Sequence, residues 1–567
     1  MSLEIISLLL LFPVIAAGPA WPLVARLNLE PAERLTVSVV LSLLGAYLLA
    51  WLIYLLTLPV ATLWVLPALG LAGFALRRRA LVETVRQPAV RTLLFAQGLL
   101  ALWCLGWLAL VPSYSGGMWM GDWFGHWQRT VFFLGQQHEN VLFNGFDPLT
   151  SRPPLVNVLV GAFLRDRPPL FASYQVIMTL LGCLAFLPAA LLASRWGGRR
   201  AVPLLAVLLM LNPLFVQNAT YAWTKLPAAF FLLAALYFFL RARGTDAPPS
   251  AGLLFAVSLA LGILAHYSAG PYAVLLAAGW LGLRPGPRDL TPWLRFTAGT
   301  ALAGVLVLAT WFGWTLAAFG VDGTFLTNTT ITDRAVTPGA QVATMLLNVR
   351  DTLVPHFLRP VDFTLLAQTS VSGWWRDWCF QLYQLNLFFA FGCLAWLVIL
   401  RELLRAGLTA TREARRFWVP FVPAVVILGI IVHSGRDTWG LVHICLQPLI
   451  LLGIAFLAAR WPSLGPAWRR VLLAGAVIDL LAGIFLHFAV QRGLIDRWLA
   501  PPDSSGLTAV YSLHAQYNLQ AKLTHQWVFA GDLFASFVPG VLAGLTFLLV
   551  AALVLAARGA SASPAPR

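Results

Sequence analysis

The sequence predicts an all-α protein, a polytopic transmembrane helical bundle of about 13–15 spans with long extracytoplasmic loops. Apolar runs of about 20 residues recur along the 567-residue chain, and each is long enough to cross about 30 Å of hydrocarbon. Mean hydropathy is +0.79 and 11% of the residues are charged, whereas about a quarter are charged in soluble domains. These observations exclude a soluble globular protein.

The charge pattern orients this bundle. The candidate spans are residues 3–24, 35–56, 57–76, 92–112, 171–194, 201–217, 222–240, 251–267, 269–283, 294–318, 382–400, 417–433, 438–459, 470–490 and 535–557. With the N-terminus outside, cytoplasmic segments hold 25 Lys and Arg against 7 Asp and Glu, and outer segments hold 13 against 14. This asymmetry follows the positive-inside rule. The net charge of +16 is therefore an orientation signal and does not indicate nucleic-acid binding.

The sequence indicates neither a disulfide framework, nor a cysteine metal site, nor a nucleotide-binding motif. Cys104, Cys183, Cys393 and Cys445 fall in predicted spans and Cys379 at a span edge, without CxxC or metal-ligand spacing. We interpret them as small core residues with no disulfide framework. The chain has neither GxxxxGK[ST] nor GxGxxG, and its predicted cytoplasmic connections are short. Function is expected in the membrane or at its outer face, where segments 113–170, 319–381 and 491–534 are long.

The first of these outer segments has unusual composition. It contains WMGDWFGHWQR at 119–129, and residues 123–134 predict a short aromatic helix along the bilayer surface. FNGFDPLTSRPP at 143–154 interrupts helix repeatedly. LVNVLVGAFL at 155–164 is apolar but too short to span, so it is predicted to be re-entrant or interfacial.

Asp122 and His126 are the candidate catalytic residues. A partly desolvated aspartate among tryptophans can accept a proton from an acceptor hydroxyl. His126 lies four residues later, on the same face of a helix, where it can orient the carboxylate or transfer a proton. The alternatives are that Asp122 caps a helix starting at Trp123, and that His126 is structural.

Candidate anion-binding residues follow on the same predicted side. Arg129 and Arg152 suit a phosphate or pyrophosphate, because the guanidinium group is a planar fork of donors. The alternative for both is a solvated charge or a lipid-headgroup contact. Lys225 lies at the outer end of a span, where it holds an anionic group or simply snorkels to the interface. Asp147 precedes a proline and suits a turn.

Further polar residues lie at other outer helix ends. His266 and Tyr267 stand beside a Gly-Pro break, which is typical of a cavity in a membrane protein or of a plain tight turn. Arg436 is a further candidate for phosphate contact, although it can also pair with Asp437. Asp479 is mid-span and is interpreted as a helix-packing acid.

The quoted motifs resemble the GT-C superfamily of membrane glycosyltransferases, and most of all the bacterial relatives of the protein O-mannosyltransferases and of the lipid A aminoarabinose transferase. The resemblance lies in GDWxxHxxR at 121–129, RPPLxN at 152–157, and the helix pairs of 211–243 and 261–281. It extends over about 92–318.

The resemblance implies inverting sugar transfer from a polyprenyl-phosphate-linked donor to a glycan, lipid or protein acceptor. It implies a multi-pass protein of the bacterial cytoplasmic membrane with a periplasmic active site. Asp122 matches the first-loop acid of the family, which acts as general base or orients the acceptor. Arg129, Arg152, Lys225 and Arg436 are then candidates to neutralise the leaving phosphate.

The chain departs from the family pattern at three places. Many relatives have an acid at the position of Lys225, and a late arginine where His443 stands here. No DxD pair follows Asp122, so we expect no cofactor, although Asp147 leaves a divalent metal open. Three helices precede the segment that resembles the first helix of the family.

These observations divide the chain into regions. They are N-terminal helices of unknown role (1–91), a GT-C-like core (92–318), an outer loop (319–381), C-terminal helices (382–490), a second loop (491–534), and a last helix with a cytoplasmic tail (535–567). A transporter or flippase for lipid-linked saccharides, or a polymerase-type partner in envelope polysaccharide synthesis, remains the alternative. A transporter is expected to carry polar residues near the midplane on several helices.

Overall fold

The computed structural model of the chain describes residues 3–111, 120–137, 141–143, 147–165, 170–243, 248, 250–282, 290–327, 337–353, 392–409, 412–432, 445–484 and 528–561. Within them the secondary structure is helical, apart from one isolated antiparallel bridge between Phe143 and Asp147.

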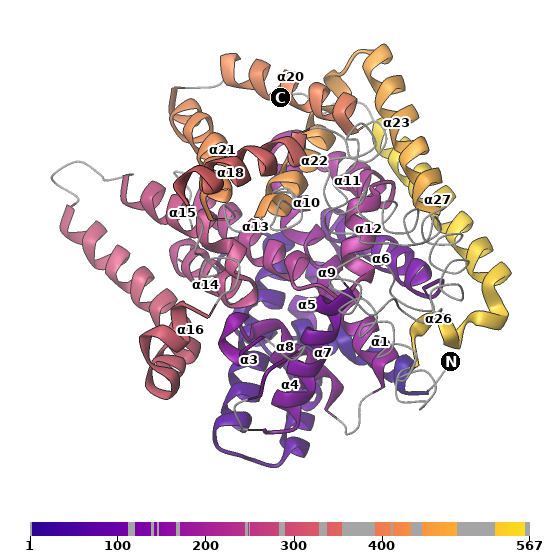
Figure 1. Cartoon of the computed structure of the whole chain (residues 1–567). Helices are drawn as coiled ribbons and strands as arrows, with labels where there is room; N and C mark the ends of the chain where they lie inside the picture. The colour runs from indigo at the N-terminus through magenta and orange to yellow at the C-terminus, as the bar shows by residue number, and fades with distance from the viewer. Residues whose placement is uncertain are drawn as a thin grey trace, which may run out of the picture.

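The helices are arranged as Figure 1 shows. Their bounds are α1 Leu3–Ala17, α2 Trp21–Val24, α3 Pro31–Leu55, η1 Val60–Trp64, α4 Val65–Leu76, α5 Arg78–Arg86, α6 Pro88–Leu108, α7 Met120–Leu134, η2 Leu149–Ser151, α8 Leu155–Leu164, α9 Phe171–Cys183, α10 Phe186–Gly197, α11 Ala201–Met210, α12 Pro213–Thr220, α13 Lys225–Ala242, α14 Ala251–Ala265, η3 Tyr267–Ala269, α15 Gly270–Gly282, α16 Leu290–Phe325, α18 Pro338–Leu353, α20 Gly392–Thr409, α21 Arg412–Val432, α22 Gln447–Arg460, η8 Trp461–Ser463, α23 Pro466–Ile484, α26 Ala530–Leu533, η11 Ala535–Phe537 and α27 Val538–Ser561.

The prediction of an all-α polytopic membrane protein is confirmed, but the helices are less regular than the predicted spans. In the described part of the chain, 7 helices are long and apolar enough to cross a membrane, or up to 9 if two bent pairs count as single spans. Other predicted spans form shorter helices. The predicted span 3–24, for example, is divided into α1 and α2, and 251–267 ends early as the 15-residue α14.

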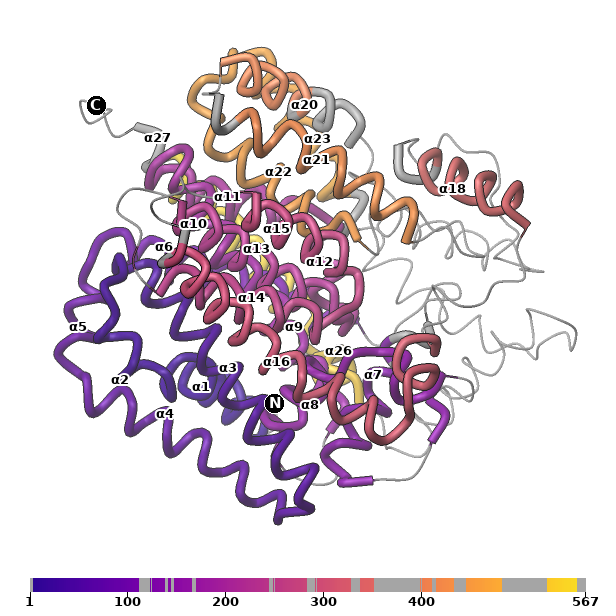
Figure 2. Tube along the Cα trace, turned by 90° about the vertical axis from the view of Figure 1, so that its left-hand side faces the viewer, coloured from indigo at the N-terminus to yellow at the C-terminus, as the bar shows by residue number. Residues whose placement is uncertain are grey.

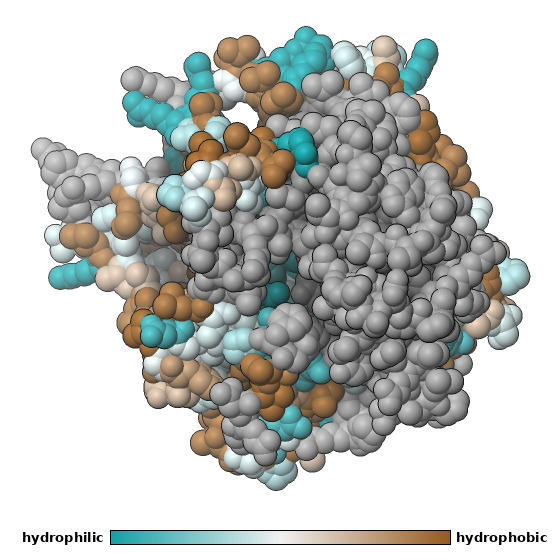
Figure 3. Space-filling view, viewed as in Figure 1, coloured by the Kyte–Doolittle hydropathy of each residue, from teal (hydrophilic) through white to brown (hydrophobic). Residues whose placement is uncertain are grey.

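Hydrophobic side chains cover the outside of the bundle as well as its core. Phe537 at the end of η11 and Phe547 and Val550 of α27 are all more than half exposed. Figure 3 shows hydrophobic surface along the edge formed by α23 and α27. A surface this apolar is expected where lipid tails surround a protein.

Contacts at one end of the bundle agree with the sidedness that the charges predict. Thr150 and Thr327, from two different predicted outer segments, bring their hydroxyl oxygens within 2.9 Å. The Tyr267 hydroxyl donates to the Thr150 carbonyl at 3.1 Å. The Gln136 amide donates to the Ile53 carbonyl at the end of α3. Each pair joins an outer segment to another outer segment or to the predicted outer end of a span.

Contacts at the opposite end join segments assigned to the cytoplasm. The Arg241 Nε donates to Glu33 at 3.0 Å, and the Tyr237 hydroxyl donates to the same carboxylate oxygen at 2.7 Å. Glu402 pairs with Arg460 at 3.4 Å. Figure 2 shows α5, which contains Arg78 and Arg79 of the predicted cytoplasmic Arg77–Arg79 run, at the opposite end of the molecule from α7.

The N-terminal helices are packed into the core that follows them. α1 contacts α3, α4, α8 and α9, and α3 contacts α6 and α8. Where α1 and α4 cross, a Cβ at Gly18 or Gly73 would collide with the backbone of the opposing segment, so only glycine permits this approach. Residues 3–86 therefore help to build the body of the protein, whatever else they do.

The predicted single span 201–217 is wrong in detail. α11 and α12 meet at an angle of 72°. Pro213 disfavours helical backbone at Asn212, which is extended with φ −93° and ψ 107°. The Asn212 side-chain oxygen then accepts the Phe215 N–H at 3.0 Å and caps the new helix. A second break, of 78° after Leu76, turns α5 away from the predicted span 57–76.

The buried carboxylate of Glu33 provides a test of this packing. Its other oxygen accepts the Glu30 N–H at 2.8 Å, so one side chain caps α3 and joins it to α13. We expect Glu33→Gln to lower the free energy of unfolding by about 2–3 kcal/mol, because Arg241 then loses its buried counter-ion. The measurement is the apparent thermal midpoint of the purified protein in detergent.

The matched control is Glu30→Gln. The side chain of Glu30 is 68% exposed and lies 3.9 Å from Arg241, so its effect should stay within about 0.5 kcal/mol. Equal shifts for the two variants would contradict the role assigned to Glu33.

Candidate functional site

Helix α7 carries the candidate catalytic residues and is packed into the protein. The described helix runs from Met120 to Leu134, so Asp122 lies within it and not at a cap before Trp123, and the N-cap alternative is wrong. Trp123 and Trp127 are buried, with ring centroids 5.0 and 5.4 Å from that of Phe171. The predicted surface helix therefore presents these aromatic rings to α9 and not to lipid.

Of the two candidate catalytic side chains, the structure describes that of His126. The side chain of Asp122 lies outside the described residues, as do Arg436, Asp437 and His443. The side chain of His126 is buried, and its backbone carbonyl accepts a hydrogen bond from the Thr130 hydroxyl at 3.0 Å. The proposed roles of Asp122 and His126 stay predictions.

Arg129 is buried and fastens α7 to the segment after Asp147. The side chain is 2% exposed, so the alternative of a solvated charge is wrong. Its guanidinium nitrogens donate to the Ser151 hydroxyl at 2.8 Å, the Pro148 carbonyl at 3.1 Å and the Gly125 carbonyl at 3.3 Å. The guanidinium carbon also lies 4.4 Å from the ring centroid of Phe143. This set of contacts is typical of a residue that positions a loop.

Tyr267 meets the same segment from the other side. Its hydroxyl donates to the Thr150 carbonyl at 3.1 Å and lies 3.5 Å from the Trp311 indole nitrogen, which donates to it. The charges of Arg152 and Arg129 lie close enough to the Tyr267 hydroxyl to act on it electrostatically. The structure therefore brings Arg129, Arg152 and Tyr267 together around η2. We call these three residues, with Thr150 and Ser151, the outer-end cluster.

His266 stands at the entrance to η3 beside this cluster. Its Nδ1 accepts the Ser268 N–H at 3.1 Å and lies 2.8 Å from the Ser268 hydroxyl. An Nδ1 that accepts a backbone N–H places the proton of the neutral ring on Nε2. These local contacts agree with the tight turn that the sequence offers as an alternative role for His266.

Lys225 begins α13 and is buried rather than snorkelling. It is 5% exposed, and its Nζ lies 5.0 Å from the ring centroid of Trp223, which stacks on Tyr221. The preceding turn contains Ala222 with φ +57°, a left-handed conformation that costs a non-glycine residue about 1–2 kcal/mol. Such strain often accompanies a functional position.

The structure supports the turn interpretation of Asp147 and places Asp479 at a cleft, while the helix-packing role of Asp479 stays a prediction. The backbone of Asp147 pairs with that of Phe143 through two hydrogen bonds of 2.8 Å, which supports the turn interpretation. Asp479 is 6% exposed in α23 and lines a cleft with Asn212, remote in sequence from α7.

Among the described residues, no three His, Cys, Asp or Glu side chains gather as a metal site requires. The expectation of no cofactor stays a prediction.

Sequence reasoning missed the hydroxyl residues of the cluster. Thr150 and Ser151 form η2 just before Arg152, yet the sequence shows only a turn-like LTSRPP. Thr327 and Trp311 are more than 150 residues further along the chain, so no local signal points to them.

The outer-end cluster yields a test of the Arg129 contacts. We expect Arg129→Lys to raise backbone hydrogen exchange in residues 147–152 by about tenfold or more, because an ammonium group cannot reproduce the planar fork. Hydrogen–deuterium exchange with mass spectrometry measures the change. The control is Thr130→Val, at the next position of α7. The hydroxyl that it removes bonds only within the helix. Unchanged exchange in Arg129→Lys would contradict the positioning role.

Neither a protein-family model nor a curated protein matches this chain. Three solved structures are similar to it. ArnT from Cupriavidus metallidurans in the apo state is 15% identical, with a TM-score of 0.45 over 80% of this chain and 74% of its own. ArnT from the same organism bound to undecaprenyl phosphate is 14% identical, with a TM-score of 0.47 over 82% and 74%.

The third is the archaeal oligosaccharyltransferase AglB from Archaeoglobus fulgidus, in complex with an inhibitory peptide and a dolichol-phosphate. It is 14% identical, with a TM-score of 0.34 over 74% of this chain and 59% of its own.

Proposed function

We propose that this protein is an integral membrane glycosyltransferase. It transfers a sugar, with inversion, from a polyprenyl-phosphate-linked donor to an acceptor at the outer end of the bundle. The observation that carries the proposal is the outer-end cluster, where two guanidinium groups and a half-buried tyrosine gather beside α7. The neighbouring α8 is a wholly buried apolar helix of 10 residues. Cations in such a poorly solvated place suit the phosphate of a lipid carrier.

Asp122 is assigned as the general base on the motif that it shares with the resembling family. Its carboxylate accepts the proton of the acceptor hydroxyl while that oxygen attacks the anomeric carbon. The bond from the anomeric carbon to the phosphate oxygen breaks, and the lipid phosphate leaves with the electron pair. Attack on the face opposite the leaving phosphate inverts the anomeric centre. His126, one helical turn later, supports the base.

The cations are assigned different tasks. Arg152 and Lys225 are proposed to stabilise the charge that develops on the leaving phosphate. Arg129 holds η2 in place through Ser151 and Pro148, so that Arg152 is correctly positioned. His266 and Tyr267 shape the same wall, and Arg436 is retained as a phosphate contact from its sequence alone.

Replacement of the base tests the reaction directly. We expect Asp122→Asn to insert and fold normally but to transfer sugar about 10²–10⁴-fold more slowly, because the amide cannot accept the proton. Transfer is measured in membranes supplied with a panel of polyprenyl-phosphate sugars. Asp322→Asn, an exposed acid near the outer end of α16, is the matched control and should keep full activity. Full transfer by Asp122→Asn would refute the assignment.

Removal of the cations tests the phosphate contacts. We expect Arg152→Gln and Lys225→Gln each to lower kcat/KM by about 100-fold, since each removes a donor aimed at developing charge. Arg295→Gln, at the predicted cytoplasmic end of α16, carries the same charge change away from the site. A loss in Arg295→Gln as large as in Arg152→Gln would show a general effect of removing positive charge. It would contradict the phosphate contact assigned to Arg152.

A transporter of lipid-linked saccharides is the second candidate. The break between α11 and α12 favours it, because broken helices with buried amides are common at transport sites. A transporter moves its substrate across vesicle membranes with every glycosidic bond intact. Such movement by Asp122→Asn, with no transfer by the unmodified protein, would favour this candidate.

A further inference from the structure

A buried carboxylate gathers three arginines at the predicted cytoplasmic end of the bundle. Glu402 of α20 is 2% exposed. One of its oxygens lies 3.2 Å from an Arg401 nitrogen and 3.6 Å from an Arg405 nitrogen, and the other lies 3.4 Å from an Arg460 nitrogen. Arg460 is the last residue of α22, so the carboxylate joins two helices whose ends the charge pattern assigns to the cytoplasm. We call these four residues the arginine cluster.

Positive charge exceeds negative charge in the arginine cluster. Within the described part of the chain, Glu402 is the acid that all three arginines meet, so two of their charges lack a counter-ion there. Each guanidinium group has five N–H donors, and one carboxylate cannot occupy them all. The side chains of Arg401, Arg405 and Arg460 are 35%, 57% and 41% exposed. An added anion can therefore reach these donors and reduce the repulsion between the guanidinium groups.

The surface of α20 beside the arginine cluster is apolar. Three exposed leucines follow one another at a spacing of four residues, and they are Leu400, Leu404 and Leu408, which are 41%, 61% and 78% exposed. At 3.6 residues per turn, Arg401 and Arg405 lie between this leucine stripe and the buried side of the helix that holds Glu402. An exposed leucine stripe on a membrane protein is expected to contact lipid. The cations therefore stand at the border of the hydrocarbon.

The turn between α22 and α23 holds the other side of the arginine cluster. The Arg401 guanidinium carbon lies 5.3 Å from the ring centroid of Trp468, which is 39% exposed. Arg469 donates to the carbonyls of Trp461 and Pro462 at 3.1 and 2.5 Å, so this fourth arginine fastens the turn itself. Figure 2 shows α20, α22 and α23 lying together. Tryptophan is enriched where a protein crosses from hydrocarbon to the head-group region, which agrees with this position.

We propose that the arginine cluster binds the phosphate head group of an anionic diacyl phospholipid in the cytoplasmic leaflet. The phosphate oxygens accept from Arg405 and Arg460, and the acyl chains lie along the leucine stripe. Basic pockets between helices on the cytoplasmic side suit such head groups. A soluble phosphate compound would meet the same cations but would leave the leucine stripe unused. The site is independent of the proposed transfer reaction, which is assigned to the opposite end of the bundle.

Native mass spectrometry of the purified full-length protein tests the site. The probes are phosphatidylglycerol, phosphatidylcholine and diacylglycerol with identical acyl chains. We expect phosphatidylglycerol to be retained about tenfold more than either other lipid. Arg405→Gln and Arg460→Gln should each lower this retention about fivefold, since each removes one cation from the phosphate. Both side chains are more than a third exposed, so neither change is expected to prevent folding.

The matched control is Arg78→Gln in α5. It removes the same charge from an exposed position on the same predicted side, and Figures 1 and 2 show α5 far from α20. Retention should be unchanged in this variant. A loss as large as in Arg405→Gln would show diffuse attraction to anionic lipid and overturn the site. Equal retention of phosphatidylglycerol and phosphatidylcholine would overturn the argument from charge.

Two further measurements keep the test decisive. Phosphatidylglycerol should raise the thermal midpoint of the unmodified protein and of Arg78→Gln, and it should raise that of Arg405→Gln and Arg460→Gln much less. The same rise in all four proteins would contradict the site, even if a variant folds less well. Inorganic phosphate in millimolar excess should leave phosphatidylglycerol bound. Its complete displacement would identify a site for soluble phosphate and overturn the assignment to a lipid.

Discussion

Every backbone N–H and C=O group inside a bilayer needs a partner from the protein, and the shape of this molecule depends on how its broken helices meet that need. Gln136 donates to the carbonyl of Ile53 at the end of α3. Arg129 satisfies the carbonyls of Gly125 and Pro148. Asn212 caps α12 where α11 stops. In each case a polar side chain is held in place where a helix ends inside the bundle. The candidate sites lie at such places.

The same requirement separates structural cations from cations proposed to bind substrate. Arg129 directs donors at a hydroxyl and two carbonyls, and its ring contact with Phe143 uses one face of the guanidinium group. An arginine so engaged serves best as a support, and we place the phosphate contact on Arg152 and Lys225 instead. The buried carboxylate of Glu33 plays a comparable supporting part at the predicted cytoplasmic end, where it joins α3 to α13.

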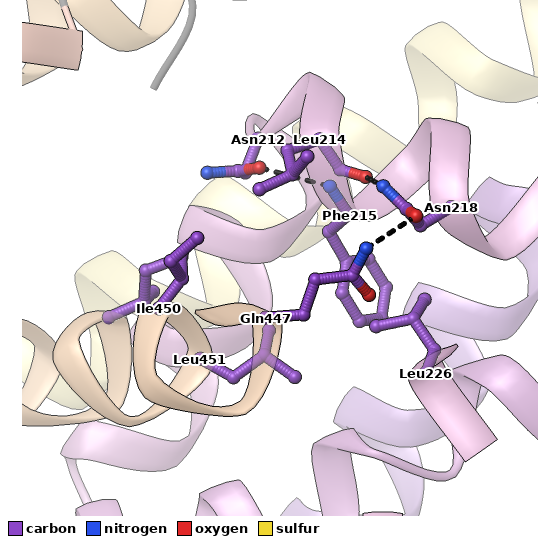
Figure 4. A pocket seen from close by; sticks show the side chains of 9 residues that line it. Asn212, Leu214, Phe215, Asn218, Leu226, Gln447, Ile450 and Leu451 are labelled. Carbon is purple, nitrogen blue, oxygen red and sulfur yellow. Dashed lines mark hydrogen bonds between the residues drawn. The ribbon is translucent and has the colours of Figure 1, made fainter. Parts of the chain in front are cut away.

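The outer-end cluster and the break between α11 and α12 differ in the polar groups that they hold. The outer-end cluster holds two guanidinium groups, which favour an anion. The break is lined by the amides of Asn212, Asn218 and Gln447 (Figure 4) and by the acid Asp479.

The sequence by itself determined the all-α membrane class, the grouping of helix ends at two opposite ends of the bundle, and the two short helices α7 and α8. Hydropathy and charge decide these features, because the cost of placing a residue in hydrocarbon depends mainly on that residue. Only the tertiary structure decided which side chains meet. Tyr267 reaches Thr150 across 117 residues and Tyr237 reaches Glu33 across 204, and no local pattern records such pairs. The angle at Asn212 and the clefts beside it likewise depend on α22 and α23, which pack there from far along the chain.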